Sequence, residues 1–173
     1  MTRGNARELA VHLIYGREFT GEEPEHVVST RLDKEYYGQL SAENDIYEER
    51  PSRAQLRYID SVVSGVANRQ EELNSDIQKF SIGWDVSRIS KLTRCIMQLA
   101  IYEILFCEDV PTGVAISEAV RLAKKYDSSE TGSFVNGILG SFARSLTAPV
   151  AEAAPAEEAP AAEAAEETSA EEL

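Results

Sequence analysis

The chain is 173 residues long, which suits one full domain with a tail and is short for two independent cores. Its formal net charge is −13 at pH 7, with 30 acidic residues against 17 lysines and arginines. Such a charge disfavours nucleic-acid binding unless lysines and arginines gather in a local patch. No stretch approaches the ~20 apolar residues that span a bilayer, so we exclude a membrane protein and expect a soluble, cytoplasmic one.

Much of the negative charge lies in the last part of the chain. Residues 147–173 consist mainly of Ala, Glu and Pro, with eight Glu and no Lys or Arg. Such a segment cannot bury enough apolar surface to offset the entropy of ordering it, so we predict a disordered acidic tail. Residues 1–146 then hold 22 acidic residues against 17 basic ones, a net charge of only −5.

Helical spacing dominates the first half of the chain. From residue 52 to residue 80 the apolar side chains recur at intervals of three and four, and Ser52 with Gln55 makes a capping-box signal. We therefore predict one long amphipathic helix over residues 52–80. The segments expected before it are two short helices at residues 5–17 and 24–37 and a polar, acidic loop at residues 39–51.

The second half has the same character. After a break near residues 81–84, three segments place their apolar residues on one arc of a helix, and no stretch alternates as a β-strand would. The predicted fold class is therefore all-α, with about six to seven helices in two packed bundles, residues 1–82 and 83–146. The helices predicted in the second bundle cover residues 90–106, 113–126 and 129–146.

Residues that usually carry catalysis or bind metals are sparse. The two histidines, His12 and His26, have no Cys, His, Asp or Glu partner at a spacing typical of a metal site. Cys95 and Cys107 would lie about 18 Å apart on a continuous helix, beyond the reach of a disulfide. A phosphate-binding glycine loop and a nucleophile elbow are both missing from the sequence. We expect a protein that is not an enzyme and that needs no metal or cofactor.

Glu103 lies in the middle of the apolar arc of the helix predicted at residues 90–106. A lone carboxylate is costly to bury, and buried charges are normally paired. We therefore expect Glu103 to pair with a Lys or Arg of a neighbouring helix, or to cap the loop that leads to Pro111. A catalytic acid would need a second perturbed acid nearby, and the sequence gives no sign of one.

A small excess of positive charge lies at the N-terminus. Arg3, Arg7 and Arg17 stand against a single acid, Glu8. Tyr15 follows Arg7 by two helical turns. Guanidinium groups can bind phosphate through two hydrogen bonds, and an aromatic ring can stack on an unpaired base of single-stranded RNA. The alternative is an ordinary solvated helix face, since exposed arginines are common.

Three sequence blocks, spread over residues 6–139, resemble the NusB family of bacterial transcription antitermination factors. The most informative block reads IxEAxxLAKK at residues 116–125, and a Ser-rich turn and FVNGIL at residues 134–139 follow it. The other two read ARELAVxLIY at residues 6–15 and LAIYEI at residues 99–104. The resemblance implies a NusB-like, all-helical fold and a role in antitermination.

In that family the first helix with its basic lead, and the start of the last helix, form an RNA surface. The resemblance implies that the target is the boxA element of nascent transcripts, notably ribosomal RNA leaders, and that the main protein partner is the ribosomal protein NusE. Other Nus factors and RNA polymerase would be indirect partners, and the NusE face is expected on residues 90–106 and their neighbours. The positions that match the RNA surface are Arg3, Arg7, Tyr15, Glu130 and Phe134.

Each of these positions has an expected role. Arg3 and Arg7 would hold phosphates, Tyr15 would stack on a base, and Glu130 would accept a hydrogen bond from a base edge. Phe134 fits both a base-stacking role and the core stripe of its helix, so both readings stay open.

The chain departs from many family members, which begin with a dense run of arginines, because it has only two before its first apolar residues. Fewer phosphate contacts mean weaker RNA binding. Two alternatives therefore stay open. One is a protein-only adaptor or homodimer with little RNA affinity. The other is an RNA-binding module related to the N-terminal domain of ribosomal RNA cytosine methyltransferases. The acidic tail disfavours this alternative, because it occupies the position where the catalytic domain of those enzymes would follow.

Overall fold

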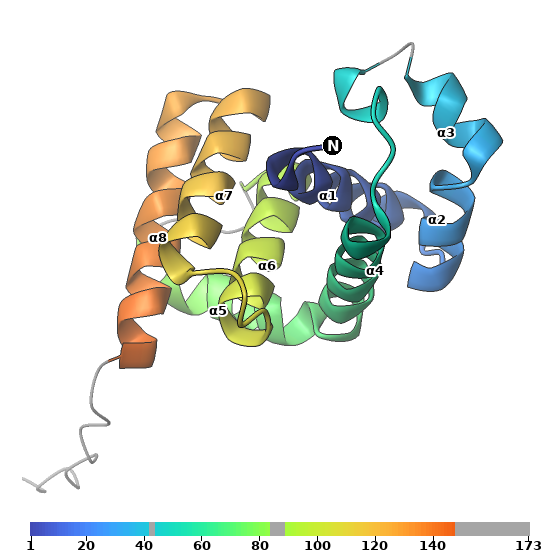
Figure 1. Cartoon of the computed structure of the whole chain (residues 1–173). Coiled ribbons are helices and arrows are strands. Elements are labelled where there is room, and N and C mark those ends of the chain that lie inside the picture. Colours follow the sequence, from blue (N-terminus) through green and yellow to red (C-terminus); the bar gives the residue numbers. More distant parts are fainter. Residues whose placement is uncertain (42–43, 84–88, 148–173) are drawn as a thin grey trace, which may run out of the picture.

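The computed structural model describes residues 1–41, 44–83 and 89–147, and all regular structure in that part is helical (Figure 1). The predicted all-α class is confirmed. The described residues form eight α-helices, more than predicted, because two of the predicted helices are each divided. The predicted tail lies outside the described residues from residue 148 on, and Thr147 is the last residue of α8. Of the predicted break at residues 81–84, only residue 84 lies outside the described residues. The elements are α1 (Arg3–Thr20), α2 (Pro24–Arg31), α3 (Lys34–Leu40), the 3-10 helix η1 (Asp45–Tyr47), α4 (Arg53–Asn68), α5 (Gln70–Phe80), α6 (Lys91–Phe106), α7 (Thr112–Tyr126) and α8 (Ser129–Thr147).

Helix α1 packs against α2, α4 and α6 near the middle of the molecule (Figure 1). Its start is capped by Thr2, whose hydroxyl oxygen accepts a hydrogen bond from the backbone N–H of Asn5. Its end is set by Gly21, which has a φ of 66° and donates its N–H to the carbonyl of Arg17. That left-handed conformation costs glycine little. Residues 6–11, 13 and 14 are buried, so polar side chains on these turns must find partners inside the protein.

The helix predicted over residues 24–37 is in fact two helices, so that prediction was wrong in its continuity. Asp33 begins α3 because its carboxylate accepts hydrogen bonds from the backbone N–H groups of Glu35 and Tyr36. This capping pattern competes with continuation of α2. The Asp at position 33, two residues after the last residue of α2, was the sequence signal that a new helix could begin there.

The predicted loop over residues 39–51 is more ordered than its composition indicates. Helix α3 continues to Leu40, and η1 follows within the same segment. The hydroxyl of Tyr37 donates to the carbonyls of Ile46 and Glu49, and the ring of Tyr37 is buried. An aromatic side chain that supplies both apolar area and a donor can thus fix an acidic segment that lacks periodicity.

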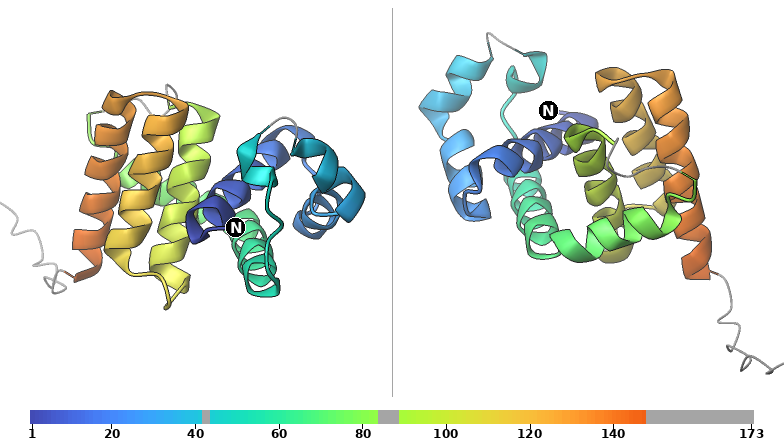
Figure 2. Two further views of the ribbon diagram at one scale, coloured as in Figure 1. Left: turned by 45° about the horizontal axis from the view of Figure 1, so that its top comes forward. Right: turned by 180° about the vertical axis from the view of Figure 1, so that it is seen from behind.

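The segment predicted as one helix over residues 52–80 bends at Arg69 and forms α4 and α5. The prediction of a single continuous helix was therefore wrong here too. The capping box of Ser52 and Gln55 is confirmed. At Arg69 the backbone leaves the helical region, with a φ of −122° and a ψ of 20°. Helix α4 packs against α1, α2 and α6, whereas α5 packs against α6 and α8, and Figure 2 shows the change of direction between them. Tertiary packing therefore overrides local helix propensity here.

Helices α6, α7 and α8 lie side by side, with α8 antiparallel to α7 (Figures 1 and 2). Helix α6 is the most enclosed, since ten of its sixteen residues are buried. It approaches α4 closely at Gly65, where a Cβ atom would overlap the ring of Tyr102. Glycine is needed at that position because any side chain would push α4 and α6 apart.

Candidate nucleic-acid interface

Arg3 stands in the first turn of α1 and points away from the core. Its side chain is 67% exposed, and its Nη2 atom lies 2.8 Å from an Oδ atom of Asp109. Asp109 belongs to the loop between α6 and α7 and is 75% exposed. An ion pair this exposed contributes little to stability, so the guanidinium of Arg3 can exchange its partner at low cost.

Arg7, one turn later on α1, is buried and fully engaged. Its Nε atom donates to both carboxylate oxygens of Glu103, at 3.0 and 2.9 Å, and its Nη2 atom lies 2.9 Å from one of them. Its Nη1 atom lies 3.5 Å from Glu118 on α7. Burial alone would lower the pKa of Arg7, but the hydrogen bonds and charge of Glu103 outweigh it and leave the pKa raised. The prediction that Glu103 pairs with a Lys or Arg of a neighbouring helix is confirmed, and the partner is Arg7.

Tyr58 of α4 completes this buried group. Its hydroxyl donates to Glu103 at 2.8 Å, and burial, followed by the charge of Glu103, raises the pKa of Tyr58. The buried carboxylate of Glu103 on α6 thus connects this helix to α1 through Arg7 and to α4 through Tyr58. Binding RNA phosphate with Arg7 would require breaking these bonds and leaving a buried carboxylate uncompensated. The structure therefore gives Arg7 a structural environment, unlike the exposed one expected from the sequence.

A second polar group surrounds Glu8, the neighbour of Arg7. The carboxylate of Glu8 accepts hydrogen bonds from Lys125 at 2.6 Å and from the hydroxyl of Tyr126 at 2.5 Å, and Arg121 lies 3.5 Å away. Burial would raise the pKa of Glu8, but the bonds from Lys125 and Tyr126 outweigh it and lower the pKa. His12 contacts the hydroxyl of Tyr126 at 2.6 Å, and burial lowers the pKa of this imidazole. This group fastens the end of α7 to α1.

Tyr15 lies near the end of α1 and is half-buried against the core. Its ring meets the ring of Phe19 edge to face, with centroids 5.0 Å apart, and Phe19 is 61% exposed. The Nζ atom of Lys91 lies 4.6 Å from the centre of the Phe19 ring. The three side chains make a surface with an aromatic edge and a cation, which suits an unpaired base.

The other predicted RNA residues stand at the start of α8. Glu130 is exposed in its first turn, and Phe134 is half-buried one turn later. Both line a hollow of about 470 Å³ between α8 and the end of α5, which also includes Phe80 and Ile82. Ile82 is 84% exposed, so the hollow has an apolar rim as well as a carboxylate. Phe134 therefore both packs against the core and faces this hollow.

The structure keeps the two sets of predicted residues apart. Arg3, Arg7 and Tyr15 lie on α1, Glu130 and Phe134 lie on α8, and α6 and α7 run between these helices in Figures 1 and 2. The end of α7 bridges the gap, since Lys125 bonds to Glu8 on one side and the neighbouring Lys124 packs against Gly132 on the other. RNA that contacted both sets would have to cross the surface between α1 and α8, to which the end of α7 contributes.

The middle of α6 offers little surface for a partner. Residues 95–103 are all buried, and exposed or half-exposed side chains occur near its ends. A NusE face on residues 90–106 would therefore have to use the ends of α6 and the helices packed against it.

Other predicted features concern metals, thiols and membranes. Across residues 1–41, 44–83 and 89–147 no group of three or more potential metal ligands occurs, and no helix there is long and apolar enough to cross a membrane. Cys95 and Cys107 are free thiols, and burial raises their pKa values to about 12 and about 11. Neither thiol is activated as a nucleophile would be.

Two residues near Arg3 were not singled out from the sequence. Asp109 precedes the Val-Pro pair of the α6–α7 loop, and Tyr58 lies on the half-buried side of α4. Their sequence positions carry no periodic or motif signal for a shared site. Only the approach of α4 and the α6–α7 loop to the start of α1 brings them together.

A family model described as the NusB family matches residues 4–144. The transcription antitermination protein NusB of Acetivibrio thermocellus is 42% identical over 144 residues, which cover 83% of this chain and 90% of that protein. A solved structure of T. maritima NusB is similar with a TM-score of 0.63 and 26% identity, covering 83% of this chain and 92% of that one. A crystal structure of antitermination factors NusB and NusE in complex with double-stranded RNA shares the fold, with a TM-score of 0.64 and 23% identity, covering 83% and 96%.

Proposed function

The chain belongs to the NusB family, and on that basis we propose that it is a transcription antitermination factor that binds boxA-like single-stranded RNA together with the ribosomal protein NusE. The observation that carries the proposal is the family match over residues 4–144, which takes in nearly all of α1 and most of α8. The protein would act as a scaffold that helps RNA polymerase read through terminators, notably in ribosomal RNA operons. Its work on nascent transcripts would take place in the cytoplasm, and it would make and break no covalent bonds.

We assign the RNA contacts to exposed and half-exposed groups. Arg3 would bind a phosphate, because its one partner is an exposed carboxylate. Tyr15 and Phe134 would stack on bases, and Glu130 would accept a hydrogen bond from a base edge. Arg7 would be a positioning residue, which holds the start of α1 through Glu103 rather than touching RNA.

NusE would supply much of the affinity. The part of the chain before the predicted tail has a net charge of −5, so few phosphates can be neutralised by this protein alone. In one solved structure of the same fold, NusB and NusE are in complex with double-stranded RNA. A joint surface would let a weakly basic subunit contribute base contacts while its partner adds phosphate contacts.

The test is RNA binding measured with and without NusE over a salt series. A labelled single-stranded RNA that carries boxA is titrated with the full chain, and fluorescence anisotropy reports binding. We expect weak binding by the chain alone and clearly tighter binding with NusE. Arg3→Ala and Phe134→Ala should each weaken the ternary assembly by about tenfold, as expected from the loss of a charged phosphate contact or one stacked base.

Lys34→Ala is the matched control for Arg3→Ala, because it also removes one exposed positive charge but lies at the start of α3. Its affinity should match wild type within about twofold. If the chain with NusE captures boxA RNA no better than an unrelated RNA of equal length, the proposal fails. A protein-only adaptor or homodimer would then be favoured, and light scattering with NusE alone would separate those two.

A further inference from the structure

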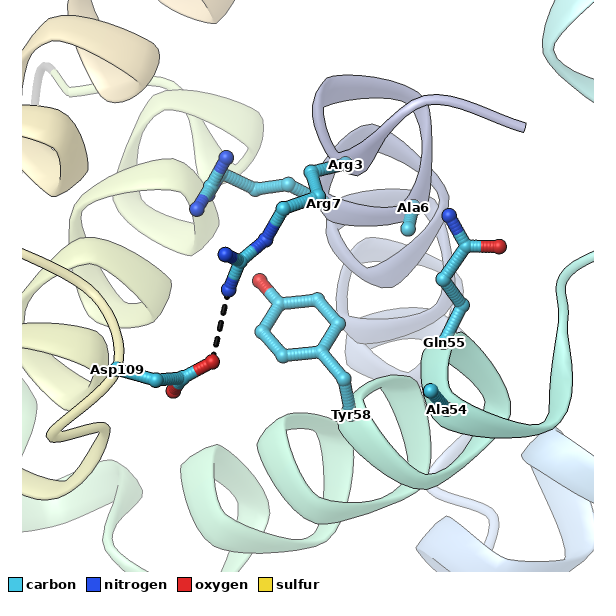
Figure 3. Close-up of a pocket in the computed structure, with 7 residues that line it drawn as sticks. All are labelled: Arg3, Ala6, Arg7, Ala54, Gln55, Tyr58 and Asp109. Atoms are coloured by element: carbon cyan, nitrogen blue, oxygen red, sulfur yellow. Dashed lines mark hydrogen bonds and ion pairs between the residues drawn. The ribbon is translucent and has the colours of Figure 1, made fainter.

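A cavity lies beside the first turns of α1, where α4 and the α6–α7 loop approach it (Figure 3). Its volume is about 260 Å³, somewhat below the range of about 300–1,000 Å³ that is usual for sites of drug-sized ligands. Ala6 and Ala54 leave the space open because their side chains are short. The residues that line it are Arg3, Ala6, Arg7, Ala54, Gln55, Tyr58 and Asp109.

The ion pair of Arg3 and Asp109 bounds this cavity. Figure 3 shows the side chain of Arg3 extending from α1 to Asp109, while Tyr58 and Gln55 project from α4. Both partners of the pair are more than half exposed, and among the described residues Asp109 has no other hydrogen-bond partner. The carboxylate therefore occupies the place on Arg3 that an anionic ligand would take.

The other polar groups of the cavity are held in place by the protein. Gln55 donates to the carbonyl of Met1 at 2.7 Å and accepts from the N–H of Ser52 at 2.9 Å, which leaves one amide hydrogen free. Tyr58 is fixed by Glu103, and that same carboxylate neutralises Arg7. The cavity thus combines a preformed aromatic wall and a fixed amide with one cation that can change its partner.

We propose that this cavity is a subsite for one nucleotide of the bound RNA, in which a phosphate replaces Asp109 on Arg3 and the base lies between Tyr58 and Gln55. The inference rests on the proposed function and adds a site that includes Tyr58, Gln55 and Asp109. Stacking on an aromatic ring and a bidentate guanidinium contact are the usual means of holding a single-stranded nucleotide. Asp109 then acts as an internal competitor that lowers the apparent affinity for RNA.

The test compares two exposed acidic neighbours on the α6–α7 loop. Asp109→Asn removes the competitor, whereas Glu108→Gln removes an equal charge from a residue that does not line the cavity. In the anisotropy assay with NusE, we expect Asp109→Asn to tighten binding by about fivefold, or about 1 kcal/mol, the upper range for an exposed pair. Glu108→Gln should change it by less than about twofold.

Two further variants connect the effect to the cavity. In an Arg3→Ala background, Asp109→Asn should no longer tighten binding, because its partner is gone. Ala54→Leu should weaken binding by about threefold or more by filling the space for the base, while the thermal midpoint stays near wild type. Circular dichroism on each variant checks that the helices are intact.

Equal effects of Asp109→Asn and Glu108→Gln would overturn the inference, as would a gain from Asp109→Asn that persists without Arg3. An effect of Asp109→Asn on NusE binding in the absence of RNA would also overturn it, since a protein group would then fill the cavity. These outcomes differ from failure of the proposed function, in which wild type with NusE does not capture boxA RNA at all.

Discussion

Arg3 and Arg7 lie one helical turn apart on α1, and each pairs with a carboxylate roughly a hundred residues further along the chain, 106 for Arg3 and 96 for Arg7. Their surroundings differ completely. The side chains of Arg7 and Glu103 are 6% and 0% exposed, whereas those of Arg3 and Asp109 are 67% and 75% exposed. A buried pair is costly to break and an exposed pair is not, so the first holds the fold and the second is free for a ligand.

The comparison shows that residue type and position on a helix do not decide the role of an arginine. Both residues looked equally suited to phosphate from the sequence. The partner and the solvent around it give Arg7 a structural environment and leave the guanidinium of Arg3 accessible, as the proposed RNA contact requires. The following changes test that division, from the largest expected effect on stability to the smallest.

Arg7→Ala should lower the free energy of unfolding by about 3–5 kcal/mol, because it leaves the buried carboxylate of Glu103 without a cation. Urea denaturation followed by circular dichroism measures the loss. Replacing Arg7, Glu103 and Tyr58 together by Met, Leu and Phe should recover most of it, since no buried charge or hydroxyl is then left without a partner. A loss below about 1 kcal/mol for Arg7→Ala would contradict the role assigned to this pair.

Glu8→Gln should cost less, about 1.5–3 kcal/mol at pH 7, because its main partner Lys125 is 49% exposed. The pKa of Glu8 is lowered in the folded protein, so its contribution is present above about pH 4.5, the ordinary value. It is lost as the pH falls through the lower folded pKa. The difference between wild type and Glu8→Gln should therefore shrink between pH 7 and pH 3 in denaturation experiments. A difference that is independent of pH would show that the charge of Glu8 is not what matters.

His12→Phe should cost about 1–2 kcal/mol at pH 7 through the lost contacts with the hydroxyls of Tyr126 and Tyr47. Burial lowers the pKa of His12, so protonation favours the unfolded chain. The contribution of this neutral imidazole is complete above about pH 6.5 and declines as the pH falls through the lower folded pKa. Wild type should therefore lose more stability than the variant when the pH is lowered from 7 to 5, as thermal melts at both pH values will show.

Arg3→Ala should have the smallest effect on stability, at most about 0.5–1 kcal/mol, because water replaces Asp109 as its partner. Asp109→Asn should be equally mild. Parallel urea titrations with Arg7→Ala give the direct comparison of the two pairs. A cost for Arg3→Ala close to that of Arg7→Ala would remove the distinction on which the RNA assignment depends.

The sequence predicted local structure well where the signal was local. The capping box at Ser52 appears as expected, and the helix predicted over residues 5–17 is present as α1, which extends from Arg3 to Thr20. The continuous helices expected across Asp33 and Arg69 were wrong for different reasons. At Asp33 a side-chain cap starts a new helix. At Arg69 the chain bends so that α4 can pack against α1 and α2 and α5 against α8, while both contact α6.

The candidate site shows the same limit. The sequence singled out Glu103 as a carboxylate that needs a cation, because it interrupts an apolar arc, but it could not identify that cation as Arg7. Asp109 and Tyr58 gave no signal at all. Their roles depend on contacts across 106 and 45 residues of chain, and helical periodicity carries no information about such distant pairs.

By itself, then, the amino-acid pattern determined the all-helical class, most helix ends and the family to which the chain belongs. The all-helical class and the helix ends follow from apolar spacing and capping, which depend on residues close together in the chain. The family follows from three sequence blocks in the order that the family uses. The tertiary structure alone decided which arginine is buried, which carboxylate stands opposite each one, and that a cavity opens beside Arg3. Solvation and charge pairing depend on what surrounds a side chain in space, and that surrounding exists only once α1, α4, α6 and α7 have packed together.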